Sequence, residues 1–136
     1  MTADRINHVV VEPESVAMPP VRRSRGARMG VLIGPDQGAG NFITRRFVLA
    51  PGARIPAHRH PTIEHEQVMV RGEMVLGVDG DVRTVRAGDA MFLPAGCAHW
   101  YENRTSDEAV FLCIIPNTSG YETEWLEAPP DGAFEG

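Results

Sequence analysis

Residues 52–72 read GARIPAHRHPTIEHEQVMVRG and hold three of the five histidines in the chain, at positions 58, 60 and 65. In a β-strand, residues two apart point to the same face, so His58 and His60 would present adjacent imidazoles. Imidazole nitrogens bind divalent metals at about 2.1 Å, and this spacing suits two neighbouring positions on one ion. His65 follows across a turn, where it can face back. The stretch therefore predicts a metal site carried on strands.

The segments around this stretch are short and extended. FITRRFVL (42–49) and AVFLCIIP (109–116) are rich in β-branched and aromatic residues, and glycine and proline recur between such runs. Asp79 and Gly80 lie between two short alternating runs, which is a hairpin signal. From residue 41 onward no segment keeps the apolar period of a helix. The sequence therefore predicts an all-β sandwich or barrel.

A second patterned stretch, residues 88–103, reads GDAMFLPAGCAHWYEN and supplies a fourth histidine, His99. Its spacing is glycine, five residues, proline, one residue, glycine, two residues, histidine, three residues and asparagine. The first stretch runs glycine, five residues, His58, one residue, His60, four residues, His65, six residues and glycine. Glycine and proline here position the ligands at strand ends and turns. Asn103 is interpreted as a side chain that bonds the backbone at a strand end.

These two patterns resemble the two motifs of the cupin superfamily. The second motif is complete, and the first departs at one position, where the usual glutamate ligand is replaced by His65. The resemblance implies a double-stranded β-helix, a small jelly-roll-like barrel. It divides the chain into an N-terminal arm or edge strands (1–40), a conserved barrel (41–117) and a C-terminal tail (118–136).

The resemblance implies four metal ligands, His58, His60, His65 and His99, and one divalent ion. It favours manganese, as in small bacterial cupins with four-histidine sites, while iron, nickel or zinc suit imidazole ligands well. Four neutral imidazoles leave the charge of the ion uncompensated, so the site should be a strong Lewis acid that attracts anions.

The glutamates near the first histidines allow a different interpretation of the ligand set. Glu64 or Glu66 could supply the missing carboxylate, but strand alternation turns both to the face opposite His65. Glu64, Glu66 and Glu102 are then either acceptors for imidazole N–H groups or solvated charges.

Several other side chains are placed by strand spacing. Tyr101 shares the face of His99 and is expected to supply a phenol at the cavity wall. Gln67, Met69 and Phe92 are expected to face inward. By resemblance, Phe111 and Cys113 line the metal cavity; the alternative is plain core. Val68 and Val70 point outward, and cupins dimerise through such a face, so a homodimer is expected.

The composition of the chain excludes several classes of function. The chain of 136 residues fits one domain, and its net charge of −5 gives no basic face for nucleic acid. All 13 basic residues are arginine, which excludes lysine chemistry and a P-loop. Two cysteines make no disulfide framework, and the sequence shows neither a signal-peptide pattern nor an apolar run of the roughly 20 residues that span a membrane. We expect a cytoplasmic protein without nucleic-acid or membrane partners.

The expected activity is metal-dependent oxidation of a small organic molecule, including dioxygenase chemistry or oxidative cleavage of a carbon–carbon double bond. Two alternatives stay open. One is a non-redox isomerase or cyclase that uses the ion as a Lewis acid. The other is a module that binds metal and a small ligand without catalysis. The substrate does not follow from the sequence, because one fold hosts many chemistries.

Overall fold

The computed structural model describes residues 7–135, and its regular structure is nearly all β. Two short 3-10 turns, η1 and η2, span Pro13–Ser15 and Pro35–Gln37. The strands are β1 (Arg25–Ile33), β2 (Phe42–Arg59), β3 (His65–Arg71), β4 (Glu73–Val78), β5 (Asp81–Arg86), β6 (Ala90–Leu93), β7 (His99–Glu102), β8 (Ala109–Pro116) and β9 (Glu124–Trp125).

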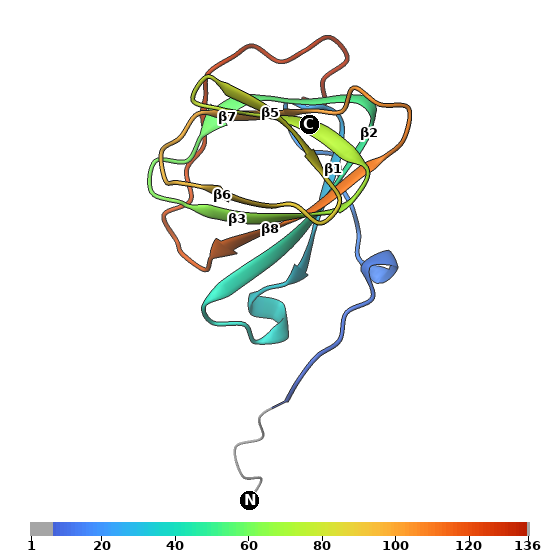
Figure 1. The fold of residues 1–136 in the computed structure, drawn as a ribbon. Helices are drawn as coiled ribbons and strands as arrows, with labels where there is room; N and C mark the ends of the chain where they lie inside the picture. Colours follow the sequence, from blue (N-terminus) through green and yellow to red (C-terminus); the bar gives the residue numbers. More distant parts are fainter. Residues whose placement is uncertain (1–6, 136) are drawn as a thin grey trace, which may run out of the picture.

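One curled antiparallel sheet contains all of these strands. Seven follow the order β5-β4-β7-β2-β8-β3-β6, and β1 and β9 each pair with β2 off this path. β2 is 18 residues long and belongs to both sides of the barrel. Its first half pairs with β1 and β8, and its second half pairs with β7 and β9. Figure 1 shows β5 and β7 lying across the barrel from β3, β6 and β8. The all-β barrel that the sequence predicts is confirmed.

The motif glycines stand where the backbone needs a left-handed conformation. Gly72 has φ 72° and joins β3 to β4, and Gly88 has φ 96° between β5 and β6. A Cβ at Gly72 would also overlap the carbonyl oxygen of Glu108. The predicted hairpin is present as well, with positive φ at Asp79 and Gly80, which two-residue hairpin turns require.

Side-chain alternation on β3 follows the prediction and places the core. Gln67 and Met69 are each 1% exposed, whereas Val68 and Val70 point outward. Phe92 does not face inward as expected, because it is 58% exposed. It pairs with Glu66, an outward residue of β3, and paired residues of antiparallel strands share a face. Its neighbour in β6, Leu93, is the buried one.

The two ends of the chain lie differently on the barrel. Figure 1 shows the chain before η1 extending away from the barrel. Residues 19–21 then run along β1, where Pro20 pairs with Arg28 and the N–H of Val21 donates to the carbonyl of Ala27. The segment after β8 returns across β2, where β9 pairs with residues 58 and 59. In the part of the chain from 7 to 135, no helix has the length and apolar character to cross a membrane.

Candidate metal centre

The four histidines of the two motifs meet inside one end of the barrel. His58 is near the end of β2 and is paired with His99, the first residue of β7. His60 follows β2 directly, and His65 begins β3. All four side chains are buried, with no more than 6% exposure. Strand ends that converge thus bring together residues that are far apart in sequence.

Three of these imidazoles form a compact donor set. One ring nitrogen from each of His58, His60 and His99 lies within 4.8 Å of the others. Two nitrogens bound at about 2.1 Å to one ion must lie no more than roughly 4.2 Å apart, so small adjustments would let all three bind. The donor set therefore fits a divalent metal ion.

Backbone carbonyls orient these three rings. The Nδ1 atoms of His58, His60 and His99 lie 2.8, 2.8 and 3.2 Å from carbonyl oxygens of residues 56, 122 and 97. A carbonyl only accepts, so Nδ1 carries the proton in each ring and Nε2 keeps its lone pair. Fixing one nitrogen in this way is how proteins prepare the other for a metal.

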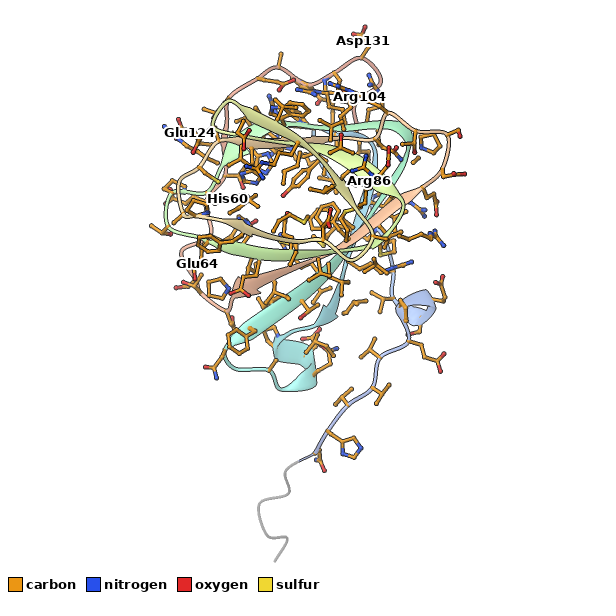
Figure 2. The ribbon with its side chains drawn as sticks, in the orientation of Figure 1. His60, Glu64, Arg86, Arg104, Glu124 and Asp131 are labelled. Atoms are coloured by element: carbon orange, nitrogen blue, oxygen red, sulfur yellow. The ribbon has the colours of Figure 1, made fainter. Side chains whose placement is uncertain are left out.

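The glutamates near the motifs do not hold the imidazoles. Glu64 and Glu66 are exposed, and Figure 2 shows Glu64 outside the barrel, whereas His60 lies within it. Glu102 forms ion pairs with Arg54 and Arg104. Glu64 and Glu66 are therefore solvated charges, and Glu102 is a partly buried partner of two arginines.

His65 lies beside the three-histidine set but is not part of it. Its ring centre is 5.0 Å from that of His60 and 5.3 Å from that of His99. Its Nδ1 is buried and has no hydrogen-bond partner among residues 7–135. A buried nitrogen without a partner is unfavourable, and a bound ion beside the ring would relieve this. His65 therefore fits a fourth ligand position chemically, although the structure groups only three rings.

Burial keeps the imidazoles neutral. Desolvation lowers the pKa of His58 to about 4, of His65 to about 3 and of His99 to about 2, and neighbouring charges add to this. The pKa of His60 is also lowered, again mainly by desolvation. At neutral pH the rings are therefore unprotonated and able to bind a cation.

The histidines line a cavity of about 230 Å³. Tyr101 and Cys113 also line it. Phe111 differs: it is fully buried and stacks behind Phe47, with ring centres 4.8 Å apart. Phe47 occupies the wall in its place. The stacked ring of Phe47, rather than Phe111, therefore borders the cavity.

Neutral hydrogen-bonding groups meet on the wall below the histidines. The Gln67 amide donates to the Tyr101 hydroxyl at 2.6 Å and contacts the Cys113 sulfur at 3.3 Å. Desolvation raises the pKa of Tyr101 well above its ordinary value. The phenol is therefore protonated at neutral pH, and it can donate its proton to an oxygen in the cavity.

Arg45 and Tyr121 are among the cavity residues that were not predicted from the sequence. Arg45 on β2 is 9% exposed, and it donates to the Cys113 sulfur at 3.0 Å and to the Tyr121 hydroxyl at 3.2 Å. Burial alone would lower the pKa of Arg45, but Cys113 and Tyr121 raise it, so the guanidinium stays charged. Tyr121, in the segment after β8, also lies 3.2 Å from Nε2 of His60.

The segment after β8 covers the cavity. Thr123 and Trp125 line it together with Tyr121. The segment is held by Glu127, whose carboxylate accepts from Arg54 at 2.8 and 3.0 Å and from the backbone N–H of Ala57 at 2.9 Å. Residues after position 118, expected to form a tail, thus contribute part of the wall.

The cavity is lined by neutral and positively charged polar groups. Its lining includes imidazoles, phenols, an amide, a thiol and arginine, but no aspartate or glutamate among residues 7–135. Such a site can hold a cation by its imidazoles and stabilise negative charge on a ligand. It offers no carboxylate to act as a general base.

Comparison with known proteins finds relatives named as polyketide synthase proteins and relatives named as oxalate oxidases. The chain is 30% identical over 88 residues to polyketide synthase CurC of Streptomyces cyaneus, covering 64% of this chain and 57% of CurC. It is 32% identical over 82 residues to oxalate oxidase GF-3.8 of Triticum aestivum, covering 54% of this chain and 37% of that protein. The chain thus spans about half the length, or less, of these curated relatives.

A solved structure resembles the chain over most of its length. The polyketide cyclase RemF from Streptomyces resistomycificus superposes with a TM-score of 0.80 at 25% identity, covering 91% of this chain and 90% of that chain. The cupin domain family matches residues 45–115, more than half of the chain and the part that carries the four histidines. The chain therefore belongs to the cupin family.

Proposed function

We propose that this chain is a metal-dependent enzyme that promotes cyclisation or isomerisation of a small oxygen-bearing molecule without changing its oxidation state. The observation that carries the proposal is the set of neutral imidazoles, three of them with Nδ1 bound to backbone carbonyls, inside a cavity that hydrogen-bond donors line. The similarity to RemF, a polyketide cyclase, along nearly the whole chain supports the same class of reaction.

In this proposal His58, His60 and His99 hold one divalent ion, and His65 provides a fourth ligand. The resemblance to four-histidine cupins favours manganese, and iron, nickel or zinc remain compatible with imidazole ligands. When bound, the ion supplies a Lewis acid for a carbonyl or enol oxygen. Four protein ligands on a six-coordinate ion leave room for a ligand with two oxygens.

The other residues of the cavity bind and orient the molecule. Tyr101 donates its proton to a substrate oxygen on which negative charge develops, and Gln67 fixes the position of the phenol. Trp125 and Tyr121 exclude bulk water from the histidine cluster, because both lie on the covering segment. No carboxylate from residues 7–135 lines the cavity, so in this scheme a water molecule held inside the cavity, rather than bulk solvent, accepts the proton.

Exchange of α-protons tests this proposal directly, because enolisation is common to cyclisation and isomerisation. The zinc-loaded protein is incubated with 2-oxobutanoate in D₂O under argon, and loss of the C3 proton signals is followed by NMR. We expect metal-dependent exchange without oxygen. Tyr101→Phe should slow the exchange about a hundredfold while zinc content stays unchanged.

The control for Tyr101 is its neighbour Trp100, which lies on the other face of β7. Trp100→Phe should exchange at the wild-type rate. No exchange by fully zinc-loaded protein, or equal exchange by metal-free protein, would contradict the Lewis-acid proposal.

A second candidate function is oxidation by molecular oxygen, supported by the 32% identity to oxalate oxidase GF-3.8. Turnover would then need manganese or iron and would consume oxygen. An oxygen electrode distinguishes the two candidates: consumption of oxygen by manganese-loaded protein, with no anaerobic exchange by zinc-loaded protein, supports the oxidase.

A further inference from the structure

We propose that Arg45, together with Tyr121, binds a carboxylate of the substrate, so that the cavity is selective for small organic acids with an apolar body and a second oxygen that reaches the histidine cluster. The proposal rests on the function proposed above, since the second oxygen is assigned to the metal. It names the substrate class and the residue that selects it.

Arg45 differs from the other arginines in its surroundings. Among the arginines of residues 7–135, it is the buried one. No aspartate or glutamate oxygen of the described chain lies within 4.0 Å of its guanidinium, whereas Arg54 and Arg59 form ion pairs. Its hydrogen bonds go to a thiol and a phenol, and its buried Nε has no partner.

A buried cation without an acidic partner is unfavourable unless a ligand supplies the opposite charge. The wall of the cavity does not supply it, because it includes no carboxylate from residues 7–135. A divalent ion on neutral imidazoles would add two further positive charges. An anionic ligand is therefore the species that balances this site.

Tyr121 shows how close Arg45 lies to the metal ligands. Its hydroxyl oxygen is 3.2 Å from a guanidinium nitrogen of Arg45 and 3.2 Å from Nε2 of His60. One oxygen atom thus touches both groups. A carboxylate on Arg45 would leave an adjacent keto or hydroxy oxygen of the same molecule within reach of an ion on the histidines.

Binding of a metal also changes what Tyr121 can do. The phenol donates to the Nε2 lone pair of His60, and that lone pair is the one a metal would take. Once the ion is bound, the O–H of Tyr121 loses this acceptor and can donate to the carboxylate instead. Arg45 and Tyr121 then form a pair of donors for one anion.

The rest of the cavity wall determines the polarity and size of the ligand beyond its carboxylate. Met29, Phe47, Ile55 and Trp125 give it an apolar surface. The cavity of about 230 Å³ is smaller than the sites that hold drug-sized molecules. A small aromatic or aliphatic acid fits both properties.

Salicylate and salicylamide test the proposal, because they share shape and a hydroxyl group but only salicylate carries the charge. Their dissociation constants for zinc-loaded protein are measured by titration calorimetry. We expect salicylate to bind about tenfold more tightly or better, since hydrogen bonds to charged groups are the stronger ones. Arg45→Met should remove this preference by weakening salicylate alone.

Arg46→Met is the matched control, because Arg46 is the next residue of β2, faces outward and lies near Glu14. It should keep the wild-type preference. Equal affinity of wild-type protein for the two compounds, or an unchanged preference in Arg45→Met, would overturn the proposal. If Arg45→Met does not fold, Arg45→Lys decides: a preference reduced several-fold supports the planar guanidinium contact, and an unchanged one overturns it.

Zinc content, measured on every sample, separates this proposal from the function on which it rests. Protein that binds none of manganese, iron, nickel and zinc would contradict the metal-dependent function. The metal-free protein would then still report on Arg45: a salicylate preference that Arg45→Met abolishes supports the anion site, and no preference overturns it.

Discussion

His65 differs from the other histidines of the cavity in one atom, a buried Nδ1 without a partner. We predict that His65→Ala lowers metal affinity at least about tenfold, because losing a ligand should weaken binding no less than losing the group that orients one. Elemental analysis after dialysis measures this. His8→Ala is the control, since His8 is exposed in the N-terminal segment. Equal metal content in both variants would remove His65 from the ligand set.

Asn103 makes a structural contribution that its position in the motif explains. Its side-chain N–H donates to the carbonyls of Leu49 and Asp107 at 2.9 and 2.8 Å, and its oxygen accepts from the backbone N–H of Thr105. We predict that Asn103→Ala lowers the free energy of unfolding by about 3 kcal/mol, because buried carbonyls lose their donors. Urea unfolding measures this.

Asn117→Ala is the matched control for Asn103, because Asn117 is exposed and its side-chain contacts are 3.4 and 3.5 Å long. It should change the free energy of unfolding by less than about 0.5 kcal/mol. Equal effects in the two variants would mean that the buried hydrogen bonds of Asn103 contribute little.

At the scale of the element, Glu127 is one of several contacts that attach the segment after β8 to the barrel, beside the pairing of β9 with β2 and the Arg59–Glu124 ion pair. This carboxylate joins Arg54 and the backbone of Ala57. We predict that Glu127→Gln increases hydrogen exchange at Leu126, whose N–H donates to the carbonyl of Ala57, by about fivefold. Glu14→Gln is the control, because Glu14 is exposed and far from this segment in sequence. Unchanged exchange at Leu126 would show that β9 holds the segment without Glu127.

The elements of the barrel and its histidines could be predicted from sequence because local patterns encode them. Two-residue alternation places Gln67 and Met69 inside, and glycines with positive φ mark the strand ends. Phe92 was placed wrongly, because alternation gives relative faces on one strand, whereas its absolute face depends on pairing with Glu66.

Arg45 and Tyr121 could not be found in this way. Arg45 and Arg46 are adjacent, so composition alone does not say which of them faces the cavity. Spacing from Phe47, two positions on, is the signal that could have decided it. Tyr121 lies in an irregular segment, where no period relates one residue to the next, and only the fold brings it to His60.

At the scale of the whole molecule, burial of neutral histidines makes stability depend on pH. The pKa values of His58, His65 and His99 lie far below the ordinary value near 6.5, mainly through desolvation. Below pH 6.5 the unfolded chain therefore binds more protons than the folded one, and stability falls as pH falls.

We predict that the metal-free protein loses up to about 1.4 kcal/mol of unfolding free energy per pH unit for each of these histidines between pH 6.5 and 5. Above pH 7 their contribution should be constant. Urea unfolding across this range measures the slope, and His58→Gln should reduce it. A stability that rises on acidification would contradict the neutral cluster.

The outer face of β3 and β6 remains the predicted dimer interface. Val68, Val70 and Phe92 are 37%, 52% and 58% exposed there, on adjacent paired strands. We predict a dimer by sedimentation velocity, and Val70→Asp should shift it toward monomer at micromolar concentration. Val82→Asp, at an equally exposed position on β5, is the control. A monomeric wild-type protein would contradict the prediction.

β2 carries both Arg45 and His58, and a straight strand would separate them by roughly 40 Å. They border one small cavity because the strand curls and has an irregular register between Ile55 and His58, beyond Gly52 with its φ of 79°. Arg45 and His58 therefore lie on one continuous strand of the sheet. Folding of the barrel fixes the positions of both residues. A ligand that contacts both therefore binds without the loss of conformational entropy that ordering them would require. Selectivity could then change by substitution at position 45 while the imidazoles stay in place.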